Sequence, residues 1–163
     1  MENAKPVNLR FAPKRNRRRR LYGMKLEFLV ARWLAKDFGW GDDILLDMIG
    51  RVDVHVLGGR KVELECKRFN LTKYVGLSWL KTNVVERYSK DAWLKVLVVT
   101  KKCWDADCEK FLAANNIKVL EVGDVNGKEQ INEAEKKFVD GFTKLYVDRL
   151  MEEEEVCREK LSR

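Results

Sequence analysis

Alternation of apolar and polar residues is clearest in the second quarter of the chain. Apolar residues occupy every second position in Arg51–Leu57 and again in Lys61–Arg68, with a glycine pair between the two runs. This period of two predicts two strands joined in a hairpin. A nearly continuous apolar run over Leu94–Thr100 predicts a further strand, buried on both faces of a sheet.

Other segments show the spacing of helices. Apolar residues three and four positions apart predict helices over Leu21–Phe38, Leu77–Ser89, Trp104–Asn115 and residues 128–163, and Ile117–Val122 predicts a last short strand. Helices that alternate with strands around a hairpin predict an α/β protein with a mixed sheet flanked by helices. We expect a core over residues 21–124, a long extra C-terminal helical extension over 125–163, and a flexible basic arm over 1–20.

The apolar residues of the hairpin also predict its register. A three-residue loop, Gly58–Arg60, places all of them on one face, and glycine supplies the left-handed backbone that such a loop needs. The predicted pairs are Val56 with Val62, Val54 with Leu64, and Val52 with Cys66.

The same register gives the other face of the hairpin its charges. Asp53 then lies opposite Glu65 and His55 opposite Glu63, with Lys67 one step along from Glu65. Facing carboxylates about 5 Å apart repel each other, so a protonated acid, a lysine or a divalent cation must compensate. Oxygen ligands from Asp53 and Glu65 suit Mg²⁺ or Mn²⁺. The alternative is a solvated face, because alternating charges are also typical of exposed antiparallel strands.

Composition narrows the class of protein. The formal net charge is +7 with 36% charged residues, which suits an anionic partner. No apolar run is long enough for a membrane span and the N-terminus lacks the apolar core of a signal peptide, so we expect a cytoplasmic, nucleoid-associated protein. Four cysteines without a CxxC pair favour inert thiols, although an iron–sulfur cluster held by all four is formally possible.

Basic residues gather near the N-terminus. These residues, which we expect to contact a nucleic-acid backbone without reading its sequence, are Lys14, Arg15, Arg17, Arg18, Arg19 and Arg20. Targeting or solubility is the alternative role for this arm. Arg51 and Arg68 flank the acidic hairpin and offer further phosphate contacts. The acidic run Glu152–Glu155 is interpreted as a solvated helix face or a frayed helix end, or as a DNA mimic that restrains the arm.

Glu27 lies close to the apolar face of the first predicted helix, where a carboxylate is costly unless it is paired or coordinates an ion. A helical acid, then an aspartate, then Glu-x-Lys on an apolar strand about a dozen residues later resembles the PD-(D/E)XK nuclease superfamily. Within it, the sequence RRRRLYGMKLEFLVARWL is most similar to archaeal-type Holliday junction resolvases. The matching residues are Glu27, Asp53, Glu65 and Lys67, with Gly23 in the first helix and Val52 where the motif often has proline.

The resemblance implies a restriction-endonuclease-like core and a metal-dependent endodeoxyribonuclease. Asp53, Glu65 and the backbone carbonyl of Cys66 would hold Mg²⁺ or Mn²⁺, Lys67 would act on the attacking water or the phosphate, and Glu27 would hold a metal-bound water or a second ion. It further implies branched DNA as substrate, a homodimer, and a role in DNA recombination and repair.

Two questions stay open from the sequence. The first is whether His55 and Glu63 assist this site or are an edge histidine and a solvated acid. The second is whether the chain cleaves DNA at all. The alternative is a non-catalytic nucleic-acid-binding or assembly protein that retains the nuclease fold.

Overall fold

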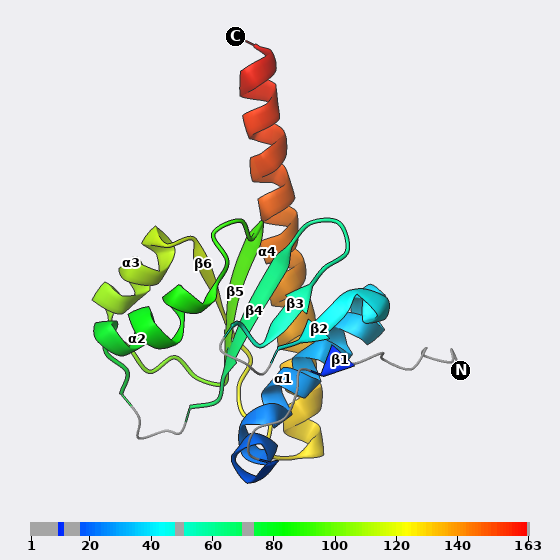
Figure 1. Ribbon diagram of the computed structural model, residues 1–163, viewed down its shortest axis with the longest axis vertical. Helices are drawn as coiled ribbons and strands as arrows, with labels where there is room; N and C mark the ends of the chain where they lie inside the picture. The colour runs from blue at the N-terminus through cyan, green and yellow to red at the C-terminus, as the bar shows by residue number, and fades with distance from the viewer. Residues whose placement is uncertain (1–9, 12–16, 48–50, 70–73, 163) are drawn as a thin grey trace.

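The computed structural model describes residues 10–11, 17–47, 51–69 and 74–162. Within these ranges a mixed sheet is flanked by helices, as predicted, and a 34-residue helix ends the described chain (Figure 1). The strands are β1 (Arg10–Phe11), β2 (Ile44–Leu46), β3 (Val54–Val56), β4 (Val62–Lys67), β5 (Leu94–Val99) and β6 (Ile117–Glu121). The helices are α1 (Arg17–Phe38), α2 (Leu77–Asn83), α3 (Ala106–Ala114) and α4 (Lys128–Leu161), with 3₁₀ turns at Gly41–Asp43 and Val85–Arg87.

The strands lie in the sheet in the order in which they occur along the chain. Strands β2, β3 and β4 pair antiparallel, whereas β4, β5 and β6 are parallel and are joined through α2 and α3. The two-residue β1 pairs parallel with β2 and is the edge strand of this six-stranded sheet. Strand β4 therefore lies in the middle of the sheet, at the change from antiparallel to parallel pairing.

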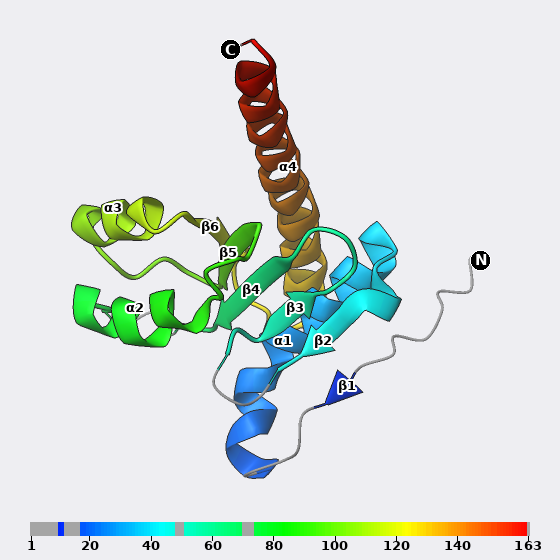
Figure 2. The same cartoon turned by 45° about the horizontal axis from the view of Figure 1, so that its top comes forward.

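Two helical layers cover the sheet (Figures 1 and 2). On one face, α1 and α4 bury an apolar cluster that includes Leu34, Val54, Leu64 and Phe138. On the other face, α2 and α3 cover the region of β5 and β6 with a second cluster that includes Leu80 and Leu97. This second face also carries the charged side chains of β3 and β4, because successive residues of a strand point to opposite faces.

The predicted hairpin register is confirmed where the backbone ladder runs. Val54 pairs with Leu64, His55 with Glu63 and Val56 with Val62. Gly59 has φ +70°, the left-handed conformation predicted for this loop.

Three boundaries differ from the predictions by three residues or more. Helix α1 begins at Arg17 rather than Leu21, so four arginines assigned to a flexible arm continue the helix instead. Arginine is a good helix former, and the charge of the segment hid that propensity. The first hairpin strand begins at Val54 rather than Arg51, and the segment after Asn83 continues as a 3₁₀ turn. Strands β1 and β2 were not predicted, because two or three residues are too few to show a period.

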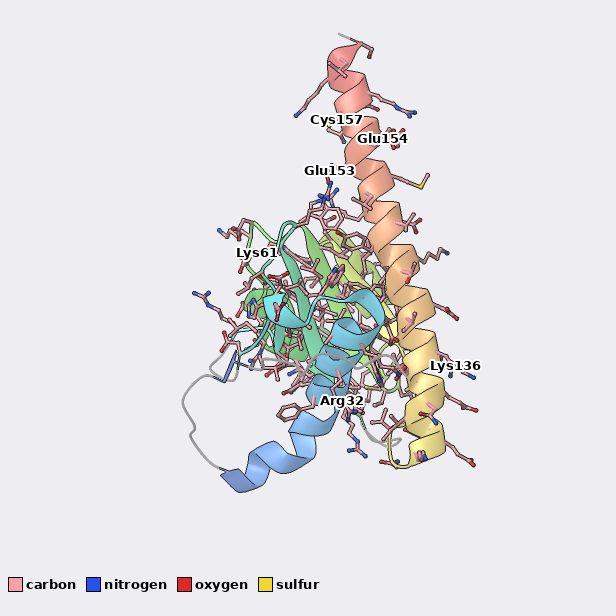
Figure 3. The ribbon with its side chains drawn as sticks, turned by 90° about the vertical axis from the view of Figure 1, so that its right-hand side faces the viewer. Arg32, Lys61, Lys136, Glu153, Glu154 and Cys157 are labelled. Carbon is pink, nitrogen blue, oxygen red and sulfur yellow. The ribbon has the colours of Figure 1, made fainter. Side chains whose placement is uncertain are left out.

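Helix α4 packs against the body of the protein and then projects beyond it (Figure 3). Its first half buries Ala134, Phe138 and Phe142 against the sheet and α1. None of the helices in the described part of the chain has the length and apolar character needed to cross a membrane.

A group of four side chains, which we call the Trp93 clamp, fixes α4 further along. The guanidinium groups of Arg60 and Arg149 lie over the Trp93 ring, 5.2 and 5.1 Å from its centroid. Glu153 accepts hydrogen bonds from Trp93 Nε1 at 2.8 Å and from Arg60 Nε at 3.1 Å. At least this member of the acidic run Glu152–Glu155 is therefore bound to the core and is not merely solvated.

Candidate active site

The four residues of the predicted nuclease motif come from three neighbouring elements. Glu27 lies in the middle of α1, and Asp53 directly precedes β3. Glu65 and Lys67 are two positions apart on β4, so their side chains point to the same face of the sheet. These positions follow from the apolar alternation, because burying Val54, Leu64 and their neighbours turns the charged residues to the other face.

Asp53 fixes the start of β3 against β4 through its side chain. Its Oδ2 accepts a hydrogen bond from the backbone N–H of Cys66 at 2.7 Å. The backbone ladder ends at the pair of Val54 and Leu64, so the predicted pairs of Asp53 with Glu65 and of Val52 with Cys66 are not part of it. The Asp53 carboxylate thus accepts the hydrogen bond from the Cys66 N–H that a backbone carbonyl of the neighbouring strand would otherwise accept. This bond holds Asp53 beside Glu65.

Glu65 is buried although few polar groups contact its carboxylate. The residue is 1% exposed, and its Oε1 lies 3.1 Å from the Nζ of Lys67. Its Oε2 is buried and has no hydrogen-bond partner among the described residues. A buried carboxylate oxygen without a donor makes the ionised form of Glu65 costly.

The pKa of Glu27 depends on the same neighbours, Asp53 and Lys67, as the pKa of Glu65. Burial and the neighbouring charge of Asp53 raise the pKa of Glu27 to about 8, while the ammonium of Lys67 acts in the opposite direction. Burial and Asp53 likewise raise the pKa of Glu65 to about 9, again opposed by Lys67. Each acid is thus close enough to Asp53 to be destabilised as an anion. Glu27 and Glu65 therefore both lie near Asp53 and Lys67.

This donor set matches a hard divalent cation in its chemistry. When they are ionised, these carboxylates outnumber the single lysine, and Mg²⁺ or Mn²⁺ would neutralise the excess negative charge. Within the described ranges, no group of three or more His, Cys, Asp or Glu side chains is already spaced to hold an ion. The predicted ligand set is smaller, with two carboxylates and the Cys66 carbonyl, and it leaves the other coordination positions to water and phosphate.

His55 and Glu63 form a neighbouring polar cluster on the same face. His55 Nδ1 lies 3.9 Å from Glu63 Oε2, and His55 Nε2 lies 3.7 Å from Asp47 Oδ2. Glu63 also accepts a hydrogen bond from the backbone N–H of Ser89 at 2.7 Å, and Lys61 Nζ lies 3.6 Å from its Oε2. Both residues are buried, so the interpretations as an edge histidine and a solvated acid are wrong.

The solvated-face alternative for the hairpin is also wrong. Every residue of β4 is buried except Lys67, which is partly buried. Sequence reasoning also missed Asp47, which lies across from Asp53 and donates its backbone N–H to the carbonyl of Asp53 at 3.0 Å. The available signal was an acid directly after a short apolar run, ILLD.

The predicted phosphate-binding residues have mixed outcomes. Lys14 and Arg15 lie outside the described residues, and Arg17–Arg20 form the first turn of α1. Arg51 is exposed, whereas Arg68 is partly buried and donates a hydrogen bond to Asn126 Oδ1. Arg51 therefore keeps a guanidinium available to a partner, and Arg68 already has one protein contact.

Burial accounts for two of the four cysteines. Cys66 and Cys108 are buried, Cys103 is partly buried and Cys157 is exposed on α4. Burial raises the pKa of the Cys66 thiol, and the carboxylates of Asp53, Glu27 and Glu65 raise it further. Cys66 is thus an inert thiol on the apolar face of the sheet. This favours the prediction of inert thiols over that of an iron–sulfur cluster.

Comparison with protein-family models gave no match, and comparisons with curated proteins and with solved structures gave none either. The resemblance to nucleases therefore depends on the motif residues and on the geometry described above.

Proposed function

We propose that this protein is a divalent-metal-dependent endodeoxyribonuclease that hydrolyses phosphodiester bonds, with branched or otherwise structured DNA as its substrate. The observation that carries the proposal is the convergence of Glu27, Asp53 and Glu65 on one partly buried lysine. Burial and mutual repulsion raise the pKa of two of these acids, to about 8 and about 9. Strongly perturbed carboxylates with a lysine are typical of catalytic sites.

Each residue has a distinct task in this reaction. Asp53, Glu65 and the carbonyl of Cys66 would hold the ion, which supplies an acidified water and a positive charge for the phosphate. Lys67 orients the attacking water or stabilises the phosphate oxygens as negative charge develops on them. Glu27 holds a water or a second ion at the same place. By the family resemblance, attack at phosphorus breaks the bond to the 3′ oxygen and leaves 5′-phosphate and 3′-hydroxyl ends.

The distribution of charge supports a polyanionic substrate. Residues 1–20 contain eight Lys or Arg and one Glu, so the remaining 143 residues have 25 charges of each sign and the whole net charge of +7 lies in the N-terminal segment. A basic segment joined to a neutral body that contains an acidic site suits backbone contacts beside a metal-dependent reaction. A homodimer would present two such sites to the two symmetric strands of a four-way junction.

The test is cleavage of labelled DNA. We expect cuts in a four-way junction or flap with Mg²⁺ or Mn²⁺, none in EDTA, and loss of cleavage in Asp53→Ala and Lys67→Ala with binding retained. Matched controls come from the neighbouring ion pair of Lys61 and Asp91, 3.0 Å apart. The variants Lys61→Ala and Asp91→Ala remove the same charges from the surface and should keep activity. Binding without cleavage for every metal and substrate would favour the non-catalytic alternative.

A further inference from the structure

Among the described residues, Lys67 contacts two side chains of different kinds. Its Nζ lies 3.1 Å from Glu65 Oε1 and 5.7 Å from the centroid of the Trp79 ring. The side chain is 21% exposed. The ammonium thus lies between a carboxylate and an aromatic face, and one side remains open to solvent. A cation over an indole face is attracted by the ring quadrupole, more strongly where water is excluded.

Trp79 is itself held by other aromatic rings. It lies on α2, and its ring packs edge-to-face on Phe69 with centroids 5.7 Å apart. Phe69 packs in the same way on Trp104 at 6.3 Å. The side chain of Thr100 fixes Phe69 further, because its Oγ1 accepts from the Phe69 N–H at 2.9 Å and donates to the Phe69 carbonyl at 3.3 Å. The indole beside Lys67 is therefore part of a packed column of aromatic rings.

The two partners of Lys67 differ in what metal binding does to them. Glu65 is a predicted metal ligand, and a carboxylate that ligates a divalent ion has less charge left for an ammonium. The indole face is not a ligand for Mg²⁺ or Mn²⁺, which prefer oxygen, so its contact with Lys67 persists. We propose that Trp79 is a positioning residue that holds the Lys67 ammonium beside the scissile phosphate when Glu65 binds the ion. This inference rests on the proposed nuclease function.

The kinetic test compares two substitutions of Trp79. We expect Trp79→Leu to lower kcat on junction DNA about tenfold with KM changed less than about twofold, the size of a desolvated cation–π contact. Trp79→Phe keeps an aromatic face and should stay within about threefold of the wild type. Trp104→Leu is the matched control, because it opens the same aromatic column without contacting Lys67. It should lower the melting temperature and leave kcat unchanged.

A second readout needs no activity. The ring current of Trp79 should shift the ε-methylene protons of Lys67 upfield in NMR spectra, with the signal assigned by its loss in Lys67→Arg. We expect the shift to persist on addition of Mg²⁺, to disappear in Trp79→Leu and to remain in Trp104→Leu. If Trp79→Leu fails to fold, Trp79→Phe supplies the same comparison with a smaller shift.

The outcomes separate the two proposals. Absence of cleavage by the wild-type protein with every metal overturns the nuclease function, and with it the role of Trp79. Cleavage with an unchanged kcat in Trp79→Leu overturns the positioning role alone. A Lys67 signal without an upfield shift, or one that loses its shift when Mg²⁺ is added, also overturns the positioning role. Equal losses of kcat in Trp79→Phe and Trp79→Leu would reject it as well.

Discussion

Strand β4 carries two glutamate–lysine pairs that look alike in sequence and differ in their surroundings. Lys61 and Glu63 form the first pair, and Glu65 and Lys67 form the second. Both glutamates are completely buried on the same face, and in each the Oε2 lacks a hydrogen-bond partner among the described residues. The two pairs thus start from the same cost of burial.

The pairs differ in what surrounds the carboxylate. Glu63 is bound by the N–H of Ser89, and its Oε2 lies within 3.9 Å of nitrogens of Lys61 and His55. Glu65 has Lys67 as its ion-pair partner and is destabilised as an anion by Asp53. Donors surround the first carboxylate, whereas other acids crowd the second. An excess of acids over donors marks the site that needs a ligand, and a balanced set marks one that stabilises the fold.

The largest difference between the two glutamates should appear in catalysis. We expect Glu65→Gln to lower kcat/KM by at least about a thousandfold, because it removes a metal ligand and its charge. Glu63→Gln keeps the shape of the side chain and should stay within about tenfold of the wild type. The measurement is single-turnover cleavage of junction DNA at a temperature where both variants are folded. Similar losses in the two variants would remove the distinction.

The unfolding free energy should depend more on Glu63 than on Glu65, the reverse of their order in catalysis. Glu63→Ala leaves Lys61, His55 and the Ser89 N–H without their shared acceptor, and breaking such a buried cluster costs about 3 kcal/mol or more of unfolding free energy. Glu65→Ala relieves repulsion with Asp53 and should cost clearly less at pH 8. Urea denaturation in EDTA measures both. A larger loss in Glu65→Ala than in Glu63→Ala would contradict the assignment of Glu63 to fold stability.

Features of the structure that depend on residues close together in the chain could be predicted from the sequence. The alternation of Val54–Val56 and Val62–Cys66 is local, so it predicted the register of these residues. Val52 was predicted on the same apolar face but packs in the second apolar cluster instead, because the ladder of β3 does not reach it. Glu27 was expected to need a partner because a carboxylate on an apolar helix face is costly, and the structure places it near Asp53 and Lys67.

Contacts between distant segments left no such pattern. Asp47 reaches His55 through the pairing of β2 with β3, and Trp79 reaches Lys67 through the packing of α2 on the sheet. Neither contact has a periodic signature in the chain. The assignment of Arg17–Arg20 to a flexible arm was wrong for a different reason. A run of arginines is typical of flexible arms, but it is also compatible with a helix.

The two sites should also differ in their response to pH. Glu27 and Glu65 have pKa values raised from 4.5 to about 8 and about 9, so the metal-free folded state binds more protons than the unfolded state between these limits. The unfolding free energy should therefore fall as pH rises from about 4.5 to about 9, by a few kcal/mol in order of magnitude, and then level off.

Urea denaturation at pH 5, 7 and 9 in EDTA measures this slope. Glu65→Gln should flatten it, and Glu63→Gln should leave it unchanged. Saturating Mg²⁺ should restore stability at pH 9 in the wild type, by about 2.7 kcal/mol at a hundredfold excess over its Kd. A wild-type slope that Glu65→Gln does not alter would contradict the crowding of acids around Glu65.

The smallest expected effect concerns Lys61, the counterpart of Lys67. Lys61 is 34% exposed and is shared between buried Glu63 and exposed Asp91. Its ion pairs are therefore screened by solvent, and Lys61→Ala should lower the unfolding free energy by about 0.5–1 kcal/mol. The variant should keep its pH slope, its response to Mg²⁺ and its rate of DNA cleavage. A loss of cleavage in Lys61→Ala comparable to that in Lys67→Ala would mean that both ends of β4 serve the reaction, and the contrast between a stabilising and a catalytic pair would fail.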